Sequence, residues 1–119
     1  MLTALIILFV LVFTACSKSD TAAAGGTGGT RTFSCTGISP KFSVDVQPIL
    51  ASVCSINSNC HAGGSVNSGG PFTNYTEVNA RKSNIKAAIL NGTMPQSGTI
   101  TQPQIDAFIC WINGGAPNN

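Results

Sequence analysis

The chain has 119 residues, a formal net charge of +2, six basic and four acidic side chains, and one histidine. Its basic residues form no longer run than Arg81-Lys82, which gives no support for nucleic-acid binding. The widely spaced carboxylates Asp45, Glu77 and Asp106, with no second histidine as a base, indicate no catalytic constellation, so we do not expect an enzyme.

The N-terminal segment is almost wholly apolar from Leu2 to Ala15. It is too short for a stable membrane span but suits the hydrophobic region of a signal peptide. It ends in Phe13-Thr14-Ala15-Cys16, which resembles a bacterial lipobox with Phe where Leu is usual. We expect cleavage of residues 1–15 and acylation of Cys16, which would anchor the protein in a bacterial cell envelope, facing the periplasm or the cell exterior. The alternative is an ordinary signal peptide that contains a cysteine.

Residues 16–32 are predicted to be a flexible tether, because they are rich in Gly, Ala, Ser and Thr and have no apolar periodicity. The folded domain is then expected over residues 33–119. A domain of this size buries little core and usually needs disulfides, a metal or a cofactor for stability.

Three helices are predicted in this domain, with little sheet because period-two alternation is absent. The first begins with Asp45 as N-cap and has Pro48 in its first turn. It leads directly into Cys54. Its apolar face repeats at helical spacing and comprises Val46, Ile49, Leu50 and Val53.

The second helix is expected from about Tyr75 to Leu90, with a possible break near Ser83-Asn84 and a stop at Asn91-Gly92. The third has the best-marked start. Thr101 and Gln104 form a capping box, and Ile100 with Ile105 forms a hydrophobic staple. Gly114-Gly115 ends the third helix.

The chemistry of the chain is concentrated in Cys54, Cys60 and His61. A cysteine directly before a histidine, with a second cysteine upstream, is typical of covalent haem c attachment, in which the thiols bond the porphyrin and the histidine binds iron. Five residues separate the two cysteines, where two are usual. The intervening residues would have to loop out, and Ser and Asn, which predominate there, suit such a loop. Met94, followed by Pro95, is the candidate for the second axial ligand.

These elements together resemble the small class I c-type cytochromes, particularly the planctomycete-type domains of bacterial lipoproteins. The resemblance covers most of residues 42–119. It is carried by Val46–Leu50, Cys60-His61, Met94-Pro95 and the terminal Trp111–Asn119. It implies an all-α, cytochrome c-like fold of about three to four helices with long loops around one covalently bound haem c. Cys54 and Cys60 would form the thioethers, and His61 and Met94 would bind the iron.

The implied function is the transfer of single electrons to and from partner proteins outside the cytoplasm. With Cys16 assigned to lipid and Cys54 and Cys60 to haem, Cys35 and Cys110 remain. We expect them to form a disulfide rather than two free thiols, because exported cysteines tend to pair.

Other roles for the cysteines stay open at this point. A Cys54–Cys60 disulfide would make the domain a structural or interaction module without haem. A zinc site with Cys54, Cys60 and His61 is a weaker alternative, because cysteines outside the cytoplasm rarely stay reduced. An open iron site, if Met94 does not bind, would allow peroxidase-like activity.

Overall fold

Helices and loops make up the computed structural model, which describes residues 29–67 and 69–119. The first helical segment is continuous and comprises η1 (Phe42–Val46), α1 (Gln47–Ile49) and η2 (Leu50–Cys54). It is followed by α2 (Tyr75–Leu90) and α3 (Gln102–Asn113), and no strand occurs in these residues. The all-α class is therefore confirmed. The predicted leader and Cys16 lie outside the described residues.

The first segment begins at Phe42, three residues before the predicted start at Asp45. Asp45 is not the N-cap; its carboxylate accepts a hydrogen bond from the backbone N–H of Lys41 at 2.7 Å. The turns at both ends are π-helical, as in the hydrogen bond from the Gln47 N–H to the Phe42 carbonyl oxygen. These wide turns fit a segment that contains Pro48, because proline cannot donate to the regular helical ladder and crowds it.

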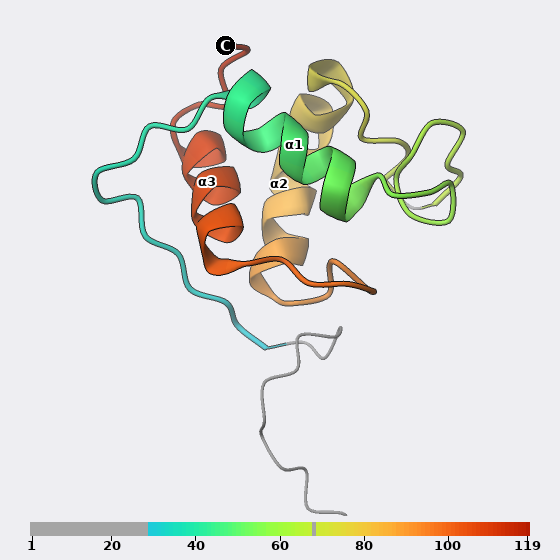
Figure 1. Cartoon of the computed structure of the whole chain (residues 1–119), viewed down its shortest axis with the longest axis horizontal. Helices are drawn as coiled ribbons and strands as arrows, with labels where there is room; N and C mark the ends of the chain where they lie inside the picture. The colour runs from blue at the N-terminus through green and yellow to red at the C-terminus, as the bar shows by residue number, and fades with distance from the viewer. Residues whose placement is uncertain (1–28, 68) are drawn as a thin grey trace, which may run out of the picture.

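Helices α2 and α3 run antiparallel, and the first segment crosses both of them (Figure 1). The side chains between them form one hydrophobic core. Trp111 at its centre is fully buried and contacts the rings of Phe42, Tyr75 and Phe108. Its indole N–H donates to the Pro117 carbonyl oxygen at 2.8 Å, so the C-terminal tail folds back over the core.

Helix α2 has the predicted bounds and continues through Ser83-Asn84 without a break. The Asn74 side chain caps its start by accepting from the Glu77 N–H at 3.1 Å. The backbone N–H and the hydroxyl of Thr73 both donate to the Glu77 carboxylate. These hydrogen bonds, the backbone one first, lower the pKa of Glu77 because they favour its charged form.

Helix α3 also starts as predicted. The Thr101 N–H donates to the side-chain oxygen of Gln104 at 2.9 Å, which is one half of the expected capping box. Ile100 and Ile105 are both buried in the core, in agreement with the predicted staple. The helix ends at Asn113, directly before Gly114.

The N-terminal segment of the domain runs along the outside of α3 (Figure 1). Cys35 is bonded to Cys110 of α3, with their Cα atoms 5.5 Å apart, so the expected pair is present. Among the described residues, hydrogen bonds to the helices begin at Arg31, two residues before the expected boundary at Phe33. The Arg31 N–H donates to the Leu90 carbonyl oxygen at 2.6 Å.

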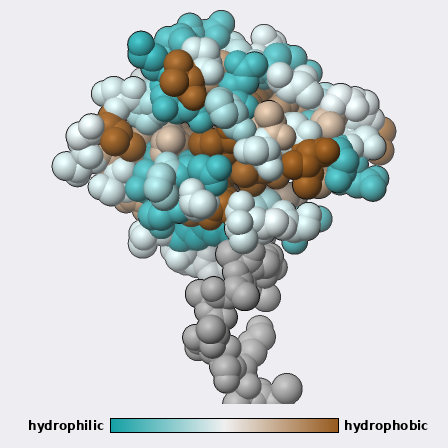
Figure 2. Space-filling model, in the orientation of Figure 1, coloured by the Kyte–Doolittle hydropathy of each residue, from teal (hydrophilic) through white to brown (hydrophobic). Residues whose placement is uncertain are grey.

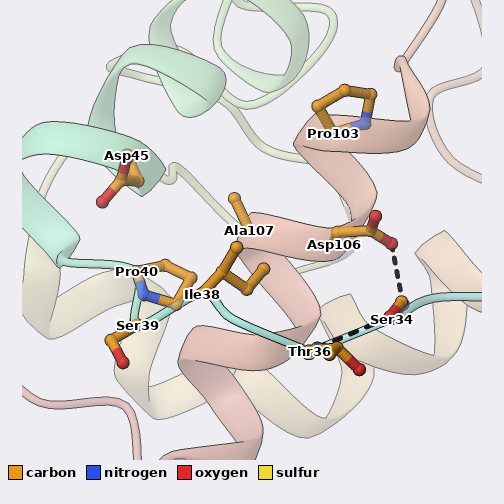
Figure 3. Close-up of a pocket in the computed structure, with 9 residues that line it drawn as sticks. All are labelled: Ser34, Thr36, Ile38, Ser39, Pro40, Asp45, Pro103, Asp106 and Ala107. Atoms are coloured by element: carbon orange, nitrogen blue, oxygen red, sulfur yellow. Dashed lines mark hydrogen bonds between the residues drawn. The ribbon is translucent and has the colours of Figure 1, made fainter.

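An open groove separates this segment from α3 (Figure 3). Two carboxylates, Asp45 and Asp106, lie on its walls. Asp106 accepts from the Ser34 N–H at 3.0 Å, and Asp45 accepts from the Lys41 N–H. Asp106 therefore holds the N-terminal segment against α3, whereas Asp45 holds Lys41 at the start of η1.

Removal of the Cys35–Cys110 disulfide should destabilise the fold substantially. The bond links residues 75 positions apart. In the loop-entropy model such a cross-link stabilises by about 4 kcal/mol. The double substitution Cys35→Ser and Cys110→Ser should lower the free energy of unfolding by roughly 2–5 kcal/mol in urea titrations. A loss below about 1 kcal/mol would show that the helices hold together without it.

Candidate functional site

A long loop follows η2 and returns to it within a few residues. Cys54, half-buried, is the last residue of η2. The backbone N–H of His61 donates to the Cys54 carbonyl oxygen at 3.0 Å. The chain thus leaves the helix after Cys54 and comes back at His61, which brings Cys54 and the Cys60-His61 pair together.

Asn57 organises the residues that loop out between the two cysteines. Its side-chain oxygen accepts from the N–H groups of Asn59 at 2.9 Å and Cys60 at 3.1 Å. Its carbonyl oxygen accepts from the N–H groups of Cys60 at 3.0 Å and Ala62 at 3.1 Å. This is the behaviour of an Asx turn, in which the asparagine side chain substitutes for backbone. The five residues between the two cysteines therefore form an ordered turn.

Two polar side chains further along the loop donate hydrogen bonds to the carbonyl oxygen of Cys60. The Ser65 hydroxyl donates to this oxygen at 2.5 Å, and the Asn67 amide donates to it at 3.1 Å. The Asn67 amide also bonds the Asn59 carbonyl oxygen. The residues before and after His61 are consequently tied to each other.

The imidazole of His61 is held in one orientation. The residue is only 7% exposed, and its Nδ1 lies 2.9 Å from the Gly70 carbonyl oxygen. Its ring stacks on Phe72, with centroids 4.1 Å apart and planes at 22°. Because a carbonyl oxygen can only accept, Nδ1 carries the proton, and Nε2 of the neutral ring keeps its lone pair. Ligating histidines in metal sites are commonly fixed in this way by a backbone carbonyl.

Gly69 permits the close approach of backbone to this ring pair. Its φ of +106° lies in the region that favours glycine. A Cβ atom here would lie 3.1 Å from the Phe72 ring and 3.8 Å from Cε1 of His61. The sequence shows Gly69 and Gly70 only as loop punctuation, and nothing in it signals their part in orienting His61.

The thiols of Cys54 and Cys60 are not bonded to each other, in contrast to Cys35 and Cys110. Burial, and to a smaller extent the nearby Cys60, raise the pKa of the Cys54 thiol to about 11. Cys54 is thus a neutral thiol at physiological pH.

Met94 comes from a different part of the chain. It is half-buried in the loop after α2, and its N–H donates to the Ala88 carbonyl oxygen at 3.1 Å. No hydrogen bond joins it to Cys54, Cys60 or His61 in the described residues. In Figure 1 the loop that contains Met94 lies below the helices, apart from the loop that contains His61 at the right.

Within residues 29–67 and 69–119, no three His, Cys, Asp or Glu side chains form a group that could hold a metal ion. Cys54, Cys60 and His61 therefore do not converge as the ligands of a zinc ion.

Exposed apolar side chains accompany these donors in the same loop. Ile56 is 49% exposed and Val66 is 96% exposed. Figure 2 shows hydrophobic surface scattered among polar residues on the face of the molecule that carries the first helical segment.

The two thiols should differ in reactivity before any ligand is attached. The pKa of about 11 keeps Cys54 protonated, and the thiolate is the reactive form. Iodoacetamide at pH 8 should therefore label Cys60 faster than Cys54, and the Cys54 rate should keep rising up to about pH 11. Mass spectrometry of peptides from protein made without haem maturation measures both rates. Equal rates at pH 8 would contradict the buried position of Cys54.

The chain matches no protein-family model, no curated protein and no solved structure.

Proposed function

We propose that the chain is a membrane-anchored, monohaem c-type cytochrome that carries single electrons outside the cytoplasm. The orientation of His61 is the observation that supports this most directly. Its Nδ1 is engaged by Gly70 and its ring is fixed against Phe72, while Nε2 keeps a lone pair for a metal. Cys60 is its neighbour in sequence, and Cys54 is joined to it through the backbone.

The residues have distinct roles in this proposal. Cys54 and Cys60 would hold the porphyrin through thioethers, and His61 with Met94 would bind the iron. The haem supplies the change of one electron between ferric and ferrous iron. The burial of His61 and its contact with Phe72 keep water from the histidine side, and a thioether ligand raises the reduction potential.

The alternative is a domain stapled by a Cys54–Cys60 disulfide that functions as a structural or interaction module. The structure leaves these two thiols unjoined although it forms the Cys35–Cys110 bond. A stapled module would also not require the buried His61 imidazole to be oriented through its Nδ1. These two observations favour the cytochrome.

The anchor and its compartment rest on the sequence. Acylation of Cys16 would tie the domain to a membrane of the bacterial envelope, where proteins that donate and accept electrons would be its partners. No helix in the described part of the chain is long and apolar enough to cross a membrane.

Expression with a haem c maturation system should yield protein with one haem held by two thioethers. Intact mass and a pyridine haemochrome spectrum measure both. Cys60→Ala and Cys54→Ala should each leave one thioether, and His61→Ala should abolish stable haem binding because the histidine side would lack its ligand. Met94→Ala should retain haem and lose the long-wavelength absorption band of thioether-ligated ferric haem.

The control is the double substitution Cys35→Ser and Cys110→Ser, which removes the disulfide outside the loop. It destabilises the fold, so its haem content is measured on the protein that stays folded, where it should match the wild type. Wild-type protein without haem absorption, and with a mass that shows two disulfides, would contradict the cytochrome and support the stapled module.

A further inference from the structure

Arg31 connects the end of α2 to the loop that contains Met94. Its backbone N–H donates to the Leu90 carbonyl oxygen at 2.6 Å. Its guanidinium Nη1 donates to the Ile89 carbonyl oxygen at 3.0 Å and to the Met94 carbonyl oxygen at 2.6 Å. One residue thus satisfies two acceptors in the last turn of the helix and a third in the loop.

The two helix contacts have a general cause. The last carbonyl oxygens of a helix lack partners within it, and a cation near this end interacts favourably with the helix dipole. The contact with Met94 has no such cause, because its carbonyl lies beyond the helix. Together with the Met94 N–H bonded to Ala88, it fixes the Met94 backbone on both sides.

We propose that Arg31 is a positioning residue for Met94, so that the side chain that ends the membrane tether also holds the axial methionine in place. This inference rests on the proposed function, in which the Met94 sulfur binds the haem iron. Arg31 lies 15 residues after Cys16, within the stretch that composition predicts to be free spacer. The point at which the tether meets the domain is therefore the point that fixes the ligand loop.

Loss of the Arg31 guanidinium would free the Met94 carbonyl and loosen the loop. A hydrogen bond to a charged group contributes enough for its removal to change a local opening equilibrium by roughly tenfold. A looser loop would hold the thioether on the iron for a smaller fraction of the time. The reduction potential should then fall, because thioether ligation is what raises it.

The test uses the full chain, purified after haem maturation, as wild type, Arg31→Ala, Arg31→Lys and Arg81→Ala. Arg81 is an exposed arginine on α2 and is the matched control for the loss of one positive charge. Arg31→Lys keeps the charge on a shorter stem and separates charge from hydrogen-bond geometry. The readouts are haem content, the long-wavelength band, the reduction potential and amide exchange at Met94.

Arg31→Ala should retain covalent haem but show a weaker band, with exchange at Met94 roughly tenfold faster than in the wild type. Arg31→Lys should lie between the two, and Arg81→Ala should match the wild type. An unchanged band and unchanged exchange in Arg31→Ala would overturn the role of Arg31 while leaving the cytochrome intact. Wild-type protein without haem would instead overturn the proposed function, and with it the ligand that Arg31 is proposed to position.

Discussion

The hydrogen bond from the His61 N–H to the Cys54 carbonyl oxygen, at 3.0 Å, is the constraint on which the site depends. Six residue steps separate Cys54 from Cys60, and an extended chain of that length would span about 20 Å. The hydrogen bond instead brings the backbone of His61 next to that of Cys54. The extra residues of the spacer then fold over Asn57. The unusual spacing is thus compatible with two thiols that act on one ligand.

The helical core gives this loop a firm base. Cys54 is the last residue of η2, and Phe42, at the other end of the same helical segment, packs on Trp111 of α3. The side chain and backbone oxygens of Asn119 accept from the Phe42 and Ser43 N–H groups, both at 2.9 Å, so the start of the segment is also held. The loop itself has few buried apolar side chains, and its order comes from hydrogen bonds to asparagine, serine and glycine.

Apolar periodicity and capping residues were enough to predict α2, the start of α3 and the presence of a helical segment before Cys54. The bounds of α2 and the start of α3 follow from Asn91-Gly92 and from the Thr101 and Gln104 pair. The start of the first segment could not be predicted in the same way. Asp45 looks like an N-cap, but its carboxylate accepts a hydrogen bond from the N–H of Lys41, which precedes it. The N–H groups of Phe42 and Ser43, at the true start, donate to Asn119 at the other end of the domain.

The residues of the candidate site also fall into those that the sequence reveals and those that only the structure reveals. Cys54, Cys60 and His61 are visible in the sequence because they are adjacent or nearly so. The parts that orient them are not visible, because they depend on backbone atoms and on distant pairs. The carbonyl of Gly70, the space left by Gly69 and the contact of Arg31 with Met94 are of this kind. Composition places Arg31 in a flexible spacer, and only its three-dimensional contacts reveal that it belongs to the domain.

The proposed site requires that His61 present an unprotonated Nε2, because its Nδ1–H donates to the Gly70 carbonyl oxygen. Nitrogen-15 NMR of the ring in haem-free protein, at a pH where the imidazole is neutral, reports the tautomer directly. We predict the Nδ1–H form, with Nε2 in the range of a ring nitrogen that carries no proton. A ring in the Nε2–H form would contradict the account, because Nδ1 could then not donate to Gly70 and the nitrogen meant for iron would be occupied.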